Sequence, residues 1–165
     1  MIRIILSDRA YDNEVYQIVK AFYPHNELEI SSARTEDLII NNSFKEDDKV
    51  NLTDVNLSSR NINTDNLLTD NLFDEEIIIN RIILIFEDSD QGHHIGIKII
   101  DNRDRKFVSY MEAPDPIKEK PSYKNTLKRQ LYRMLSVLSK KELPWGILTG
   151  IRPTKIIYDM LEQGM

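Results

Sequence analysis

The sequence predicts an α+β domain built on a mixed sheet of about five strands, with helices on one face of that sheet. Three observations lead to this class. The first 32 residues read as strand, helix and strand, three β-prone stretches joined by short turns follow between residues 77 and 112, and a long amphipathic helix is expected after them. With 165 residues, 41% of them hydrophobic, the chain is long enough to bury one sizeable core.

The N-terminal part predicts a β-α-β unit. Ile2–Leu6 is a short apolar run typical of a strand, and Ser7 and Asp8 then offer side-chain oxygens that can cap a helix. Apolar residues recur at helical spacing after this point, namely Val15, Ile18, Val19 and Phe22. Residues 28–32 alternate in polarity and predict a second strand. Because a helix is the usual connection between parallel neighbours, we expect these two strands to be parallel.

Residues 41–75 differ in composition from the rest of the chain. Eight asparagines and no glycine or proline fall between residues 41 and 74, and eight acidic against three basic residues give residues 41–75 a net charge of -5. Their apolar residues are too sparse to offset the entropy cost of ordering. We therefore expect a low-complexity, disordered insertion. Its aspartates lack the spacing and central glycine of a calcium loop.

The second half of the domain predicts a meander followed by a helix. Ile77–Phe86 is the most β-prone run, and residues 95–99 and 107–112 follow it after short turns, so we expect three antiparallel strands. A helix is expected from Ser122 to about Lys140. Its apolar residues share one face: Tyr123, Leu127, Leu131, Met134, Leu135 and Leu138.

Several kinds of chemistry are excluded or disfavoured by the residues present. The chain contains no cysteine, which excludes disulfides, thiolate metal sites and cysteine nucleophiles. Adjacent His93 and His94 would point apart, and we interpret them as turn histidines facing water. No apolar run is long enough to span a bilayer, and no signal peptide is evident. We expect a cytoplasmic chain with no membrane partner, no metal site and no catalytic residue of its own.

The predicted C-terminal helix is strongly basic. Residues 118–141 hold eight basic residues and one acidic residue, a net charge of +7. Four side chains form the candidate basic surface: Lys124, Lys128, Arg129 and Arg133. Two interpretations stay open. These residues either form a solvated face, or they bind phosphate or carboxylate groups with Tyr123 or Tyr132 available for stacking.

The stretch from Leu143 to Met165 is rich in residues that control the backbone, among them Pro144, Gly146, Gly150 and Pro153. An expected helix begins near Pro153, and its free N–H groups favour an anion. Four side chains surround that helix start: Thr149, Arg152, Thr154 and Lys155. They either bind a substrate anion or contact a neighbouring domain. The helix that follows carries an apolar stripe that needs a partner: Ile156, Ile157, Met160 and Leu161.

The run Lys141–Lys155, KELPWGILTGIRPTK, and the preceding Lys124–Tyr132, KNTLKRQLY, resemble the N-terminal region of HemZ-type radical S-adenosylmethionine proteins. These are similar to oxygen-independent coproporphyrinogen III oxidase, also called coproporphyrinogen dehydrogenase. The resemblance covers about residues 121–165. It implies for the parent enzyme a [4Fe–4S] cluster, S-adenosylmethionine and a porphyrinogen substrate in porphyrin and haem biosynthesis. The cluster needs a CxxxCxxC motif, which this chain lacks, so no cofactor-binding residue is carried over.

The resemblance implies an organisation for the chain. Residues 1–140 would form an accessory domain that is not catalytic by itself. Residues 141–165 would form the joint to the radical S-adenosylmethionine catalytic region, whose barrel is the expected partner within the same polypeptide. Two alternatives stay open: a nucleic-acid or polyanion module that uses residues 118–141, with nucleic acid the less favoured partner, and a dimerisation domain that pairs through the C-terminal apolar stripe.

Overall fold

The computed structural model describes residues 1–41, 50–51, 77–144 and 146–147. The helices and strands of this part are, in chain order, β1 (Ile2–Leu6), the 3-10 helix η1 (Arg9–Tyr11), α1 (Asp12–Phe22), β2 (Leu28–Ser32), α2 (Thr35–Asn41), β3 (Val50–Asn51), β4 (Ile79–Ser89), β5 (Gly92–Asp101), β6 (Lys106–Ala113) and α3 (Lys120–Ser139).

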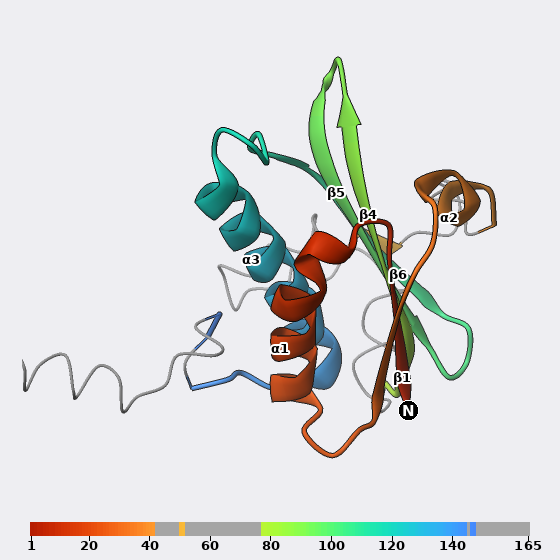
Figure 1. Cartoon of the computed structure of the whole chain (residues 1–165). Helices are drawn as coiled ribbons and strands as arrows, with labels where there is room; N and C mark the ends of the chain where they lie inside the picture. The colour runs from red at the N-terminus through yellow and green to blue at the C-terminus, as the bar shows by residue number, and fades with distance from the viewer. Residues whose placement is uncertain (42–49, 52–76, 145, 148–165) are drawn as a thin grey trace, which may run out of the picture.

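A mixed sheet forms the centre of the domain, with the strand order β2-β1-β4-β5-β6-β3 in the described residues (Figure 1). Strand β1 pairs in parallel with both β2 and β4, whereas β4, β5 and β6 form an antiparallel meander. The α+β class, the parallel β-α-β unit and the meander are therefore confirmed. The strand that the sequence did not predict is β3, which pairs with Phe107 and Val108. Of the expected insertion 41–75, the structure describes Asn41, at the end of α2, and β3; the other residues lie outside the described part of the chain.

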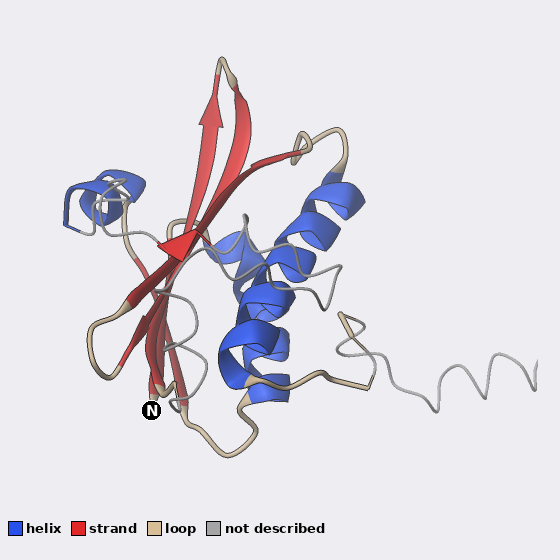
Figure 2. Cartoon of the chain, turned by 180° about the vertical axis from the view of Figure 1, so that it is seen from behind, coloured by secondary structure: helices blue, strands red, loops and turns tan. Residues whose placement is uncertain are grey.

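The main core lies between the sheet and the layer formed by α1 and α3 (Figures 1 and 2). Side chains of β4 alternate between the two faces, with Ile82 and Leu84 on the side of α1 and α3. The apolar stripes predicted for both helices are buried in this core. The side-chain amide nitrogen of buried Gln130 of α3 donates a hydrogen bond to Ser109 Oγ at 2.8 Å, which links α3 to β6.

Helices lie on both faces of the sheet rather than on one. The short helix α2 lies on the face opposite α1 and α3 (Figure 1), where Leu38 packs with Ile83, Ile85 and Ile100. The sequence did not reveal α2, because its seven residues are too few to show a helical period. None of the helices in the described part of the chain has the length and apolar character needed to cross a membrane.

The chain after α3 remains attached to the core. Helix α3 ends at Ser139, and the following Lys140 has a φ of 55°, in the left-handed region that terminates helices. Leu143 then packs against the main core, and its backbone N–H donates a hydrogen bond to the hydroxyl of Tyr132 at 3.0 Å. The ring of Tyr132 lies 5.3 Å from that of Phe22. The first residues of the expected joint are thus fixed to α1 and α3.

We predict that Leu131→Ala lowers the free energy of unfolding by about 2–5 kcal/mol, because Leu131 is fully buried between α3 and the sheet and truncation leaves a cavity. The matched control is Asn125→Ala, on the exposed side of the same helix, which should change stability by less than about 0.5 kcal/mol. Urea denaturation monitored by circular dichroism measures both. Equal losses in the two variants would contradict the placement of α3.

Candidate functional site

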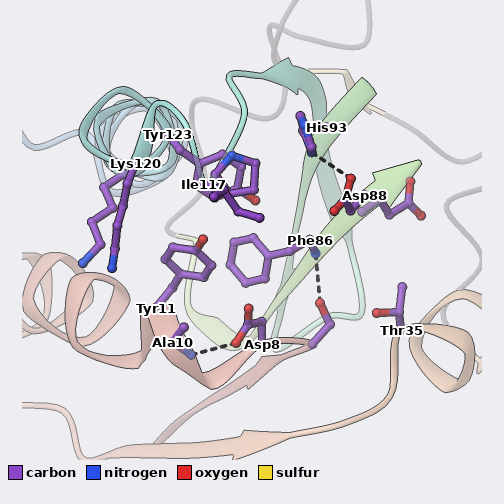
Figure 3. A pocket seen from close by; sticks show the side chains of 14 residues that line it. Asp8, Ala10, Tyr11, Thr35, Phe86, Asp88, His93, Ile117, Lys120 and Tyr123 are labelled. Carbon is purple, nitrogen blue, oxygen red and sulfur yellow. Dashed lines mark hydrogen bonds and ion pairs between the residues drawn. The ribbon is translucent and has the colours of Figure 1, made fainter. Parts of the chain in front are cut away.

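A cavity of about 720 Å³ lies at the carboxyl ends of β1 and β4. We call it the switch-point pocket. Its walls come from the loop after β1, the 3-10 helix η1, the end of β4, the start of β5 and the beginnings of α2 and α3 (Figure 3). The lining residues are Ser7, Asp8, Ala10, Tyr11, Thr35, Phe86, Glu87, Asp88, His93, Pro116, Ile117, Lys120, Tyr123 and Lys124.

The topology of the sheet places this pocket. Strand β1 lies between two parallel neighbours, β2 and β4. The chain leaving β1 forms α1 on one face, whereas the chain leaving β2 forms α2 on the other face. Connections that depart to opposite faces leave a crevice at the carboxyl ends of the central strands, which is where open α/β sheets bind ligands.

Hydrogen bonds fix the loop that follows β1. The backbone N–H of Ser7 donates to Leu84 O at 3.0 Å, and the N–H of Phe86 donates to Ser7 Oγ at 2.9 Å. Asp8 then accepts a hydrogen bond from the N–H of Ala10 at 2.8 Å and starts η1. Asp8 thus caps η1, the 3-10 helix that leads into α1, whereas α1 itself has no side-chain cap. Ser7 ties β1 to β4 instead of capping a helix.

Three aromatic rings from three different elements form the floor of the pocket. The ring centroid of Tyr11 lies 4.6 Å from that of Phe86 and 5.3 Å from that of Tyr123. These separations are typical of favourable aromatic pairs. Tyr11 is 8% exposed and Tyr123 is 3% exposed, so both rings are almost entirely buried. The aromatic cluster therefore holds η1, β4 and α3 together and gives the pocket an apolar base.

The phenol groups of Tyr11 and Tyr123 are protonated at neutral pH and can act as hydrogen-bond donors. Burial raises the pKa of Tyr11, and the nearby carboxylates of Asp8 and Glu14 raise it further. Burial likewise raises the pKa of Tyr123, with added contributions from Tyr11, Asp8 and Asp88. Within the described part of the chain neither hydroxyl makes a hydrogen bond, although both residues line the pocket.

His93 lies on the rim of the pocket. Its Nδ1 is 2.9 Å from Asp88 Oδ1 and its Nε2 is 3.8 Å from Asp115 Oδ2. His94 points to the other face and stacks on Tyr110, with centroids 5.2 Å apart and planes inclined by 6°. The expectation that the two side chains point apart is confirmed. The expectation that they face water in a turn is wrong, because both lie in β5 and are half-buried against neighbouring side chains.

The four residues of the candidate basic surface have different surroundings. Lys124 is half-buried and its Nζ pairs with Glu14 Oε1 on α1. Lys128 is also half-buried, whereas Arg129 and Arg133 are exposed. One of the four cations is therefore used to join α3 to α1, and the most open part of the expected surface consists of the two arginines.

The ion pair between α1 and α3 affects the titration of its carboxylate. Burial raises the pKa of Glu14, but the hydrogen bond from Lys124, a backbone hydrogen bond and the charges of Lys124 and Lys128 outweigh this, so the pKa lies below its ordinary value of 4.5. A carboxylate with a lowered pKa stabilises the folded state when it is ionised.

Four other predicted site residues, Thr149, Arg152, Thr154 and Lys155, lie outside the described residues, as does the apolar stripe that follows them. Sequence reasoning also missed the switch-point pocket, because its lining residues are far apart in the chain. The available signal was weak: polar residues follow the predicted strand ends at Leu6 and Phe86. Residues 1–41, 50–51, 77–144 and 146–147 contain no group of three or more side chains able to hold a metal ion.

No family model, curated protein or solved structure matches this chain.

We predict that Glu14→Gln lowers the free energy of unfolding by about 1–2 kcal/mol at pH 7, because it removes a charged hydrogen bond between two helices. The difference in the free energy of unfolding between this variant and the unsubstituted chain should be largest above pH 4.5. It should shrink as the pH falls through the lowered pKa of Glu14. Urea denaturation at pH values from 7 down to the acid limit of folding measures it.

The matched control is Glu29→Gln, which breaks an exposed pair with Arg3 at 3.3 Å and should cost less than about 0.5 kcal/mol. A Glu14→Gln penalty that stays constant with pH would contradict the assignment.

Proposed function

We propose that residues 1–140 form the N-terminal accessory domain of a radical S-adenosylmethionine oxidoreductase similar to oxygen-independent coproporphyrinogen III oxidase. The observation that carries the proposal is the run Lys141–Lys155, which resembles this family over a long and specific stretch. The domain acts in the cytoplasm, within porphyrin and haem biosynthesis. Its partner is the catalytic barrel, to which residues 141–165 form the joint.

The structure of the described residues is compatible with this role. Among the described residues, every buried member of the core formed by the sheet, α1 and α3 precedes residue 140. Leu143 is held by the hydroxyl of Tyr132 and by packing against that core. A fixed exit from the domain supports a rigid joint better than a free linker, because a joint transmits a defined orientation.

The residues of this chain do not fit a [4Fe–4S] cluster. The cluster is held by cysteine thiolates, and the chain has none. The catalytic barrel would therefore supply the cluster and the S-adenosylmethionine site, and the accessory domain contributes no step of the radical chemistry. Arg152 and Lys155 are proposed either to fasten the joint or to bind a propionate of the porphyrinogen across it, with Thr149 and Thr154 beside them.

A polyanion-binding module is the second candidate, and the exposed Arg129 and Arg133 favour it. Its support is weaker, because Lys124 is already paired with Glu14. Phosphate binding that depends on few cations is weak, because the electrostatic contribution grows with the number of phosphates that are neutralised. Nucleic acid is therefore the less favoured partner.

The accessory-domain proposal predicts that the natural reading frame encodes a CxxxCxxC motif shortly after Met165. Sequencing the gene beyond that codon tests this directly. Anaerobic reconstitution with iron and sulfide should then give the visible absorption of a [4Fe–4S] cluster in the longer protein, and none in the 165-residue chain. A continuous frame without the motif, or a longer protein that holds no cluster, would contradict the proposal.

A further inference from the structure

The switch-point pocket has the size and the lining of a small-molecule site. Its volume of about 720 Å³ lies within the range of pockets that enclose a small organic molecule. Phe86 and the two tyrosines of the floor provide an apolar base, and Pro116 and Ile117 add an apolar wall. Ile117 is 86% exposed, an unusual state for an isoleucine, and it lines the pocket.

Charge in the pocket is unbalanced. Three carboxylates line it, those of Asp8, Glu87 and Asp88, against the ammonium groups of Lys120 and Lys124. Lys124 is paired with Glu14, which is not a lining residue, and the imidazole of His93 contacts Asp88. Three carboxylates therefore share the pocket with the ammonium of Lys120 and one imidazole. Glu87 accepts a hydrogen bond from the hydroxyl of Tyr110, and its negative charge adds to the electrostatic potential of the pocket. The potential inside the pocket therefore favours a cation.

A second, independent feature points to a ligand. Tyr123 is only 3% exposed and lines the pocket. Its hydroxyl has no hydrogen-bond partner in the described part of the chain. A phenol hydroxyl at the wall of a cavity is hydrogen-bonded by water or by a ligand that replaces that water. Tyr11 beside it is in the same state. A ligand with a polar group near the floor would satisfy both.

The aromatic rings and the carboxylates lie together. Figure 3 shows Asp8 below, and Asp88 to one side of, the rings of Tyr11 and Phe86, with Lys120 on the other side of those rings. An ammonium over a tyrosine or phenylalanine face is attracted by the ring, and the attraction grows when the site is partly desolvated. The carboxylates then act on the same positive charge as the rings do.

We propose that the switch-point pocket binds a small organic cation, an ammonium or guanidinium compound with an apolar body. The cationic group lies between the carboxylates of Asp8 and Asp88, and the apolar body lies on the rings of Tyr11, Phe86 and Tyr123. This inference concerns the described domain alone. It holds or fails independently of the radical enzyme to which the domain is assigned above.

The test uses the full 165-residue chain and three probes of one shape: benzylammonium, benzyl alcohol and phenylacetate. Affinities are measured by ligand-observed NMR or calorimetry. Benzylammonium should bind at least roughly fivefold more tightly than either other probe, and its affinity should fall with added salt while that of the alcohol does not.

Two substitutions test the carboxylates. Asp8→Asn keeps an oxygen that can cap η1 while removing the charge, and Asp88→Asn removes the second charge. Together they should weaken benzylammonium roughly 5- to 30-fold and leave benzyl alcohol unchanged. The matched control is Asp104→Asn, in the turn between β5 and β6 at the opposite end of β5, which should leave all affinities unchanged.

Tyr123→Phe is a milder variant that removes only the free hydroxyl, and a few-fold loss is expected. It keeps the test decisive if the asparagine variants do not fold. Preference for phenylacetate, equal affinity for all three probes, or no binding of benzylammonium to the unsubstituted chain would each overturn the proposal.

Discussion

The pairing of β1 with two parallel neighbours is the constraint on which the rest of the structure depends. A strand that pairs in parallel with a neighbour on each edge requires crossover connections between the strands. Both faces of the sheet at that strand must then be covered by other parts of the chain. Ile2, Ile4 and Leu6 are at most 1% exposed and face the layer of α1 and α3, whereas Ile5 packs with the cluster beneath α2. The same crossovers bring the carboxyl ends of β1 and β4 to one edge, and the pocket forms there.

The features predicted from sequence are those that local periodicity encodes. The stripe of α1, the alternation in residues 28–32 and the apolar runs of the meander each repeat at a period that specifies helix or strand. Helix α2 was missed because it is too short to show a period, and β3 because two residues carry none. Most helices and strands of the described fold could therefore be predicted from the sequence, but the helix on the second face of the sheet, α2, could not.

The candidate site was less predictable than the fold, for a different physical reason. Its floor combines Tyr11, Phe86 and Tyr123, which come from three elements and meet only when the sheet and both helices are assembled. Burial of His93 likewise depends on Asp88 and Asp115, which approach from different segments. The resemblance in residues 141–155 pointed instead to the far end of the chain. The two proposals assign separate roles, ligand binding and attachment, to two different parts of the chain.

The most direct test of this account is a titration of the isotopically labelled 165-residue chain with benzylammonium, followed by backbone amide NMR. The account predicts saturable shifts concentrated at the carboxyl ends of β1 and β4, from Ser7 to Tyr11 and from Phe86 to Asp88, with the amides of the β5–β6 turn unaffected. Shifts confined to other surfaces, or no saturable shifts at the strand ends, would contradict the claim that the switch-point pocket is the functional site.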